Sequence, residues 1–369
     1  PLNLLFCQNC KTVQLNATTN PKILFEDYVW VTGTSLGANN YSNYFYKNVV
    51  KRVKNLSKKE NIFEIASNDG TFLKQFKKNG YGVIGIDPAK NISRIANDNG
   101  IKTLPVFFNK NNSVLIKNNY GKASLIFARN VIPHVENIHS IFDGVKNLLD
   151  KNGTFVIEFH YSNKILKELH YDSIYHEHIF YFSLKTLINA LKKYKLFPYD
   201  VFKSPISGGS LVLFFNSQNI KKTKKLKNLL NKEKINLINS LISWKKFSKS
   251  SQEHSKKFLD TIKKIKLKNN LFGYGASARS STLLNYSKIN HNLIDFIIDK
   301  NPLKNDKYTA GSKIKIISPK VARTRVKKYN YCVLLAWNFK KEIISDLKKL
   351  NFKGKVLVPL PRTIKVYNV

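Results

Sequence analysis

The stretch between residues 61 and 87 constrains the fold of this chain more than any other part of the sequence. It begins with a short apolar run, Asn61–Ile65, which predicts a buried strand; a glycine-containing turn and a helical pattern over Thr71–Lys78 follow. A second apolar run, Gly82–Ile86, predicts another strand that ends at Asp87. Strand, turn, helix and strand in this order make a βαβ unit with parallel strands.

The same alternation of strands and helices continues to about residue 160. Two further strands are predicted at Lys122–Phe127 and Thr154–Glu158, with helices over Ile92–Asn99 and His139–Leu149. Strands that alternate with helices of this length favour an α/β fold with a doubly wound, parallel, Rossmann-like sheet.

A second α/β unit follows a helical, Lys-rich segment at residues 216–268, which we interpret as one or two connecting helices. The strand Asn270–Gly275 runs into a turn, a helix through Tyr286 follows, and Phe296–Asp299 completes a second βαβ unit. Further strands are predicted at Val333–Ala336 and Lys355–Val358.

The net charge of +40 over 369 residues does not indicate a nucleic-acid-binding protein. Of the 63 basic residues only 7 are Arg, and proteins that recognise phosphates favour Arg for its bidentate geometry. The lysines are spread over every segment instead of forming one stripe with aromatic residues. No apolar run approaches the roughly 18 residues that a transmembrane helix needs. We therefore expect no nucleic acid and no membrane as partners, and a cytoplasmic location.

Two of the three cysteines suggest a partial metal site. Cys7 and Cys10 have the Cys-x-x-Cys spacing of half a tetrahedral zinc site, whereas Cys332 lies in an apolar strand and is expected in a core. The chain begins with Pro and contains no Met, which indicates an internal fragment or a processed chain. The second pair of zinc ligands is then expected upstream of Pro1.

The first glycine turn predicts a nucleotide-type cofactor. Asp87 follows Glu64 by 23 residues, the spacing at which an acidic residue binds ribose hydroxyls in such folds. The turn lacks the three glycines of the dinucleotide fingerprint, which disfavours NAD and favours S-adenosylmethionine. The expected cofactor contacts are Glu64, Ala66, Ser67, Asn68, Asp69, Gly70, Asp87, Pro88 and Asn130.

The segment Tyr175–His178 has the composition of a proton-transfer site. It places a phenol, two imidazoles and a carboxylate in four consecutive positions. Histidine titrates nearest neutrality, so one of these imidazoles is the natural candidate for a general base, and a polar capping loop is the alternative. The histidines at 139, 160, 170, 254 and 291 are expected to be surface or packing residues.

Together these motifs resemble the sugar C-methyltransferases that act on nucleotide-linked deoxyketosugars, and the resemblance spans essentially the whole chain. It rests on Pro1–Leu15, the turn from Glu64 to Leu73, Ala128–His134 and Asp172–His178, the hairpin Ser207–Leu211, and the C-terminal stretches Gly273–Tyr286 and Trp337–Asn338. Two departures are Ala66, where relatives carry glycine, and Trp30, at a position where relatives carry Tyr.

The resemblance implies four parts: a partial zinc-binding module (1–25), a methyltransferase domain (26–215), a helical linker (216–268) and a second Rossmann-like domain (269–369). It implies that His178 removes a proton next to a ketone, with Tyr175 as the competing base or ketone donor. Glu177 would orient an imidazole, His134 would contact the sugar or the enolate, and an aromatic residue such as Tyr28 would close over the site.

The remaining implied contacts concern the substrate. His176, Tyr274 and Arg279 would bind the nucleotide-linked sugar, with Arg279 on a phosphate at a helix N-terminus. Any zinc on Cys7 and Cys10 would be structural, and the protein would be a monomer or a weak oligomer. The rival interpretation keeps the fold and S-adenosylmethionine but transfers the methyl group to oxygen or nitrogen of another small molecule.

Overall fold

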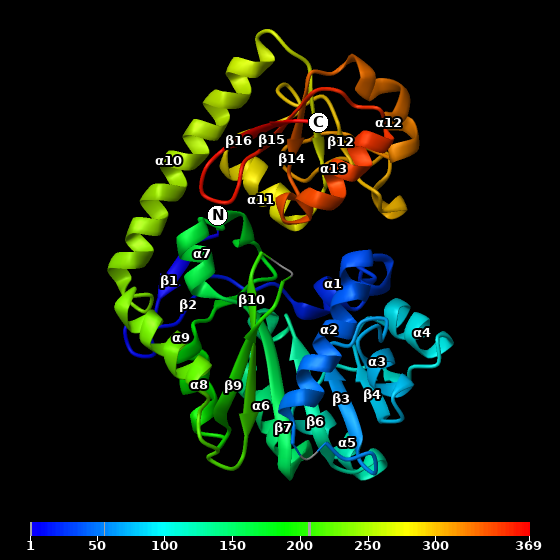
Figure 1. Cartoon of the computed structure of the whole chain (residues 1–369), viewed down its shortest axis with the longest axis vertical. Coiled ribbons are helices and arrows are strands. Elements are labelled where there is room, and N and C mark those ends of the chain that lie inside the picture. Colours follow the sequence, from blue (N-terminus) through cyan, green and yellow to red (C-terminus); the bar gives the residue numbers. More distant parts are fainter. Residues whose placement is uncertain (1, 55, 206–207) are drawn as a thin grey trace. The chain divides into compact units, whose positions relative to one another are not determined.

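The computed structural model describes residues 2–54, 56–205 and 208–369, so Pro1 and Ser207 of the predicted motifs lie outside the described residues. The chain forms two compact units (Figure 1). Unit 1 comprises Pro1–Ser162 and His176–Asn239, and unit 2 comprises Asn163–Tyr175 and Ser240–Val369. The boundary between the units therefore falls inside the Tyr175–His178 motif.

Unit 1 contains a seven-stranded sheet in the order β5-β4-β3-β6-β7-β10-β9. Its neighbours from β5 to β7 pair in parallel, and β10 runs antiparallel to both β7 and β9. The strands are β3 (Asn61–Ile65), β4 (Gly82–Ile86), β5 (Thr103–Leu104), β6 (Ala123–Arg129), β7 (Leu149–His160), β9 (Phe197–Lys203) and β10 (Ser210–Asn216).

Helices cover both faces of this sheet (Figure 1), and two separate apolar cores form as a result. One core joins the sheet to α5 (Lys110–Tyr120), α6 (Ile138–Leu148), α8 (Leu184–Lys192) and α9 (Lys224–Ile235). The other core joins it to α2 (Leu36–Arg52) and α3 (Leu73–Lys78). The remaining described helices of the unit are α1 (Pro21–Phe25), η1 (Thr32–Thr34), α4 (Lys90–Asp98) and η2 (Ile132–His134).

A small antiparallel sheet of unit 1 fixes the chain just after the His-rich motif. It pairs β1 (Leu4–Phe6) with β2 (Val13–Leu15), and β2 with β8 (Phe180–Tyr181). The N–H of Leu15 donates to the carbonyl of Ile179 at 2.8 Å, and the N–H of Ile179 donates to the carbonyl of Pro133 at 2.9 Å. The segment that follows His178 is therefore held between the N-terminal strands and the η2 turn.

Unit 2 contains a six-stranded sheet in the order β13-β12-β11-β14-β15-β16, parallel except for the last strand. Its strands are β11 (Leu271–Tyr274), β12 (Ile297–Ile298), β13 (Ile316–Ile317), β14 (Tyr331–Leu334), β15 (Lys355–Val358) and β16 (Lys365–Asn368). Its helices are α7 (Ser162–Glu168), η3 (Tyr171–Ser173), α10 (Leu241–Lys266), α11 (Ala278–Tyr286), η4 (Pro302–Lys304), α12 (Pro319–Arg325), η5 (Val326–Lys328), η6 (Trp337–Phe339) and α13 (Lys340–Lys349).

The predicted fold class, two Rossmann-like α/β units, is confirmed. The strands predicted at Asn61–Ile65, Gly82–Ile86 and Lys355–Val358 have the predicted bounds. The expectation of a wholly parallel first sheet is wrong in one respect, because β10 enters it antiparallel between β7 and β9. The segment 216–268, predicted to contain one or two connecting helices, contains two, α9 in unit 1 and α10 in unit 2.

Substitution of Gly85 tests how closely β4 packs on the turn after β3. A Cβ atom at Gly85 would overlap the buried side chains of Ser67 and Thr103, both close to the end of this strand. We expect Gly85→Ala to lower the free energy of unfolding by about 1–3 kcal/mol and to weaken binding of S-adenosylhomocysteine. Urea unfolding and calorimetric titration measure the two effects.

The matched control is Gly37→Ala in α2, where a Cβ atom would meet only Ser35 Oγ, at 3.7 Å. That substitution should leave stability unchanged or raise it by up to about 1 kcal/mol. Equal effects of the two variants on binding would contradict the packing argument.

Candidate functional site

The turn after β3 has a backbone conformation that brings main-chain atoms to the carboxyl edge of the sheet. Ala66, Asn68 and Gly70 all have positive φ, at 54°, 52° and 75°. Glycine adopts this region without strain and Ala does not, at a cost of roughly 1–2 kcal/mol. The turn at Ala66 therefore has a conformation that glycine would adopt without strain.

Asp87, at the end of β4, clamps this turn. One carboxylate oxygen accepts the N–H of Asn68 at 2.8 Å, and the other accepts the N–H of Ala89 at 2.9 Å. Burial raises the pKa of Asp87, and the two backbone donors oppose that shift. The carboxylate lies at the carboxyl end of the second strand, where such folds bind ribose hydroxyls. Pro88, next to it, is half-buried.

The turn also holds the loop that contains Trp30. The Asn68 amide accepts the N–H of Thr32 at 2.8 Å and donates to the carbonyl of Trp30 at 2.9 Å. Asp69 accepts the N–H of Gly33 at 2.8 Å. Trp30 itself is 44% exposed. Two of the predicted cofactor residues thus fix the loop that precedes α2.

A buried ionic cluster lies beneath the turn. The guanidinium of Arg129, at the end of β6, contacts Glu64 Oε1 at 3.1 Å and Glu158 Oε2 at 3.7 Å, and it lies over the ring of Phe72. The Tyr41 hydroxyl donates to Glu158 at 3.1 Å. Burial raises the pKa of both glutamates, and Arg129 opposes this shift. Arg129 is not among the site residues predicted from the sequence, although a lone Arg at the end of an apolar strand indicates a buried ion pair.

Unit 1 brings together four of the five residues predicted to be catalytic. The rings of His134 and His178 pack edge to face, with their centroids 4.8 Å apart. Glu177 Oε2 lies 3.9 Å from His134 Nδ1 and accepts a hydrogen bond of 3.4 Å from the Tyr28 hydroxyl. The amide of Asn91, on α4, donates to the carbonyl of Tyr28 and accepts its N–H, which fixes the backbone there.

The environment of this cluster favours neutral forms. Burial lowers the pKa of His134 to about 4, so its imidazole is uncharged at neutral pH. Burial raises the pKa of Glu177, and the Tyr28 hydrogen bond opposes that shift. Burial and the Glu177 charge raise the pKa of Tyr28 well above its ordinary value. The arrangement can accept and donate protons in one place, as a general base with hydrogen-bond donors requires.

The other residues of the motif and of strand β6 lie as follows. Tyr175 is half-buried and belongs to unit 2, whereas His176 is exposed and belongs to unit 1. Asn130 has a φ of 50° and donates its N–H to the carbonyl of Glu158 at 2.8 Å. Its position directly after β6 puts it at the same sheet edge as the turn and Asp87.

The second glycine turn, in unit 2, repeats the clamp with one difference. Asp299 accepts the N–H groups of Ala276 and Asn301 at 2.8 and 2.9 Å. Here Lys304 Nζ also lies 3.5 Å from Asp299 and donates to the carbonyl of Ala276 at 2.7 Å. A lysine therefore shares this carboxylate, unlike Asp87 in unit 1.

Two predicted substrate contacts in unit 2 are engaged by carboxylates of the same unit. Tyr274 is 3% exposed, and its hydroxyl donates to Asp346 at 3.2 Å. Arg279 donates two hydrogen bonds to Asp172, at 2.9 and 2.8 Å.

Cys7 and Cys10, the predicted zinc ligands, are not joined by further ligands among the described residues. Cys7 is half-buried, Cys10 is exposed, and both are free thiols. Hydrogen bonds from the backbone and side chain of Cys10 lower the pKa of Cys7. A structural zinc site takes four ligands. Across residues 2–54, 56–205 and 208–369, no group of three or more His, Cys, Asp or Glu side chains could hold a metal ion. The residues that the structure describes therefore do not fit a complete zinc site.

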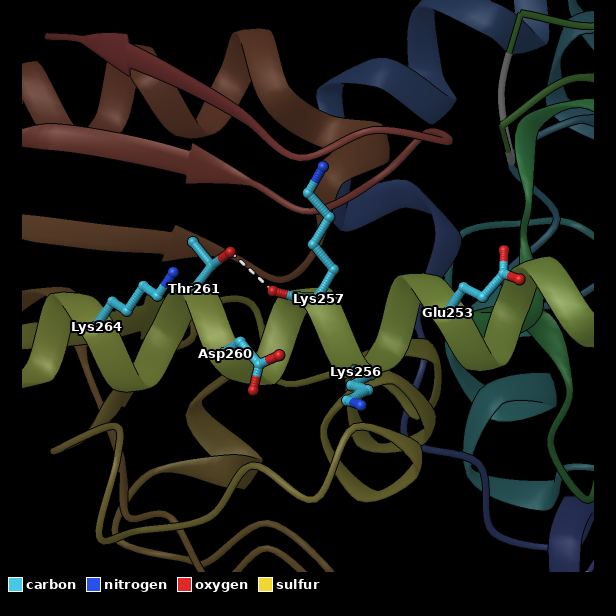
Figure 2. Close-up of a pocket in the computed structure, with 6 residues that line it drawn as sticks. All are labelled: Glu253, Lys256, Lys257, Asp260, Thr261 and Lys264. Carbon is cyan, nitrogen blue, oxygen red and sulfur yellow. Dashed lines mark hydrogen bonds between the residues drawn. The ribbon is translucent and has the colours of Figure 1, made fainter.

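One pocket of the structure lies on α10 and contains none of the predicted site residues (Figure 2). Glu253, Lys256, Lys257, Asp260, Thr261 and Lys264 line it. All six come from one helix, and the Thr261 hydroxyl donates to the carbonyl of Lys257 at 2.7 Å. Among the described helices, none combines the length and apolar character that crossing a membrane demands.

Comparison with known proteins gives the family of the chain. Residues 39–196 match a methyltransferase domain model, and residues 205–361 match the model described as the C-methyltransferase C-terminal domain. C-methyltransferase NovU of Streptomyces niveus is 30% identical over 365 residues, which are 98% of this chain and 86% of that protein. The chain belongs to the C-methyltransferase family.

Solved structures resemble the chain over about half of its length. A protein from Pyrococcus horikoshii aligns with 55% of this chain and 100% of its own, at 15% identity and a TM-score of 0.41. Geranyl diphosphate C-methyltransferase from Streptomyces coelicolor aligns with 47% of this chain and 77% of its own, at 10% identity and a TM-score of 0.37.

The C-methyltransferase is a SAM-dependent enzyme, and the first glycine turn fits that cofactor. Glu64 Oε2 and Ser67 Oγ are buried without a hydrogen-bond partner among the described residues, so polar atoms are left for a ligand at the turn. Asp87 would supply the carboxylate that ribose hydroxyls require. When bound, S-adenosylmethionine supplies a methyl group on a positively charged sulfur.

The depressed pKa of His134 predicts a pH dependence of stability. Its folded-state pKa of about 4 lies below the ordinary value of 6.5, so the unfolded chain binds more protons between these limits. Stability should therefore fall as pH falls from about 7 to 5, by up to about 2 kcal/mol from this residue. Urea unfolding of the wild type and of His134→Gln at both pH values isolates the contribution. An equal pH effect in both proteins would contradict a buried neutral His134.

Proposed function

We propose that this C-methyltransferase acts on a nucleotide-linked deoxy-ketosugar and methylates the carbon next to the ketone. The observation that carries the proposal is the cluster of Tyr28, His134, Glu177 and His178 in the same unit as the cofactor turn. A carbon acid beside a ketone is very weak, so its ionisation requires both a base and donors near the carbonyl oxygen.

The proposed roles follow from this chemical need. His178 removes the proton from the carbon, and Tyr175 is the competing candidate for this base. His134 donates a hydrogen bond to the developing enolate oxygen, since its imidazole is neutral at pH 7 and carries one N–H. Tyr28, whose hydroxyl donates to Glu177, closes over the site. Glu177, next to Tyr28 and His134, orients these two groups.

The carbon that loses the proton then forms a bond to the methyl carbon. The methyl–sulfur bond breaks in the same step, and its electron pair stays on sulfur. The chain's own contribution is placement: the turn and Asp87 hold one reactant, and the histidine cluster holds the other in line. The buried setting of the cluster strengthens its hydrogen bonds to a developing negative charge.

The domain division and the remaining contacts complete the proposal. We keep the N-terminal module, methyltransferase domain, linker and second Rossmann-like domain as functional parts. His176 is exposed, and it contacts the nucleotide-linked sugar in this proposal. The proposed location of the protein is the cytoplasm. Membership of the C-methyltransferase family disfavours methyl transfer to oxygen or nitrogen.

Proton exchange at the substrate carbon tests the proposed base independently of methyl transfer. With S-adenosylhomocysteine bound in D₂O, the wild type should replace the hydrogen next to the ketone of a nucleotide-linked 4-ketosugar. We expect His178→Asn to slow this exchange about 10²–10⁴-fold, because the variant lacks the imidazole that accepts the proton. NMR of the sugar measures the rate.

The control is His291→Asn, which changes an exposed histidine of unit 2 and should exchange at the wild-type rate. Calorimetry should show unchanged S-adenosylhomocysteine binding in both variants. Wild-type exchange by His178→Asn would remove His178 from the role of base, and the same measurement on Tyr175→Phe would then decide for its competitor.

A further inference from the structure

The segment that leads into the catalytic motif is bound by unit 2. Residues Asn163–Tyr175 belong to that unit, and the chain passes into unit 1 between Tyr175 and His176. The segment contains η3 (Tyr171–Ser173), which packs against α11. Whatever fixes this segment therefore fixes one end of the Tyr175–His178 motif.

Asp172 is the centre of these contacts. Its side chain is 1% exposed. Arg279 Nε and Nη2 donate to its two oxygens at 2.9 and 2.8 Å, a bidentate pair. Trp337 Nε1 donates to the same carboxylate at 2.8 Å, and the guanidinium of Arg279 lies 4.9 Å from the Trp337 ring centroid. Three donors thus hold one buried carboxylate, three positions before Tyr175.

Further hydrogen bonds hold the backbone on either side of Asp172. The Tyr171 hydroxyl pairs with His254 Nδ1 at 3.0 Å, and His254 Nε2 lies 2.9 Å from the carbonyl of Pro359. On the other side, the Thr282 hydroxyl donates to the carbonyl of Ile174 at 3.2 Å. These partners come from α10, α11 and the residue after β15, so several elements of unit 2 converge on the segment.

The ion pair with Asp172 also limits the ability of Arg279 to bind a phosphate. The sequence predicted a phosphate contact, because Arg279 follows a glycine turn at the start of α11. A phosphate would have to compete with a buried carboxylate that already takes two of its donors. Withdrawal of Arg279 would leave Asp172 as a buried charge with one remaining donor, which is costly.

We infer that Asp172 is a positioning residue of the methyl-transfer reaction, held by Arg279 and Trp337, and that Arg279 serves the catalytic motif instead of the substrate phosphates. The inference rests on the proposed function, because it needs Tyr175–His178 to be catalytic. Unit 2 then contributes to the rate by fixing the backbone that enters the motif.

Kinetics of three variants test the inference: Asp172→Asn, Arg279→Lys and Trp337→Phe. Misplacement of catalytic groups lowers kcat, whereas loss of a phosphate contact raises KM. We expect Asp172→Asn and Arg279→Lys to lower kcat and the α-proton exchange rate about 100-fold, because neither variant can form the bidentate pair. KM for the nucleotide-linked sugar and the inhibition constant of thymidine diphosphate should stay within about twofold of wild type.

Trp337→Phe guards against loss of folding, because it removes one donor and leaves the ion pair intact. We expect a smaller loss of kcat, about tenfold, with wild-type binding of S-adenosylhomocysteine. Arg323→Lys changes an exposed Arg of α12 and should have wild-type kinetics.

Two results would overturn the inference. One is a rise in KM and in the thymidine diphosphate inhibition constant for Arg279→Lys with kcat unchanged, which would make Arg279 a phosphate ligand. The other is wild-type kcat in folded Asp172→Asn and Trp337→Phe. Absence of proton exchange in the wild type itself is a different result, and it would count against the proposed function instead.

Discussion

The glycine turns after β3 and after β11 are each held by a carboxylate that accepts two backbone N–H groups. In unit 1, Asp87 binds the N–H groups of Asn68 and Ala89, and in unit 2, Asp299 binds those of Ala276 and Asn301. A carboxylate supplies acceptors at the point where the chain leaves the strand and its backbone donors need partners. The turns can therefore adopt left-handed conformations without losing hydrogen bonds.

The consequences of the first clamp extend to the candidate site. With its backbone fixed by Asp87, Asn68 holds Thr32 and Trp30 by its side chain. This loop lies between Tyr28 and α2, so the turn that fits the cofactor also restrains the chain next to the proposed catalytic cluster. In unit 2, Lys304 also contacts the carboxylate of Asp299. The hydrogen bonds that hold the segment before the catalytic motif are made instead by Arg279 and Trp337 to Asp172.

The few arginines of this chain have a different role from its many lysines. The chain has 56 Lys and 7 Arg, from 63 basic residues in total. Three of the arginines form the structural ion pairs Arg52–Asp200, Arg129–Glu64 and Arg279–Asp172, each with at least one partner less than one-fifth exposed. A planar guanidinium suits such sites because it fills two acceptors at once. The large positive charge therefore says little about the site, whose chemistry depends on a few carboxylates and imidazoles.

Sequence patterns predicted the parallel strands well, because buried strands of a doubly wound sheet are short apolar runs with clear ends. Asn61–Ile65 and Gly82–Ile86 are examples. The antiparallel position of β10 and the pairing of β2 with β8 were not predictable, since both depend on contacts distant in sequence. The cofactor turn was singled out by spacing, whereas His134 was singled out by resemblance alone. The ion pair between Arg279 and Asp172 was not predictable either, because 107 residues separate its partners in the sequence.

Methyl transfer from carbon-13-labelled S-adenosylmethionine to a nucleotide-linked 4-ketosugar tests directly whether this protein methylates the carbon next to the ketone. We expect a product whose labelled methyl carbon shows one-bond coupling to a ring carbon next to the ketone, detected by NMR. A labelled methyl group on oxygen or nitrogen, or label transfer to substrates that lack a ketone next to the methylated carbon, would contradict it.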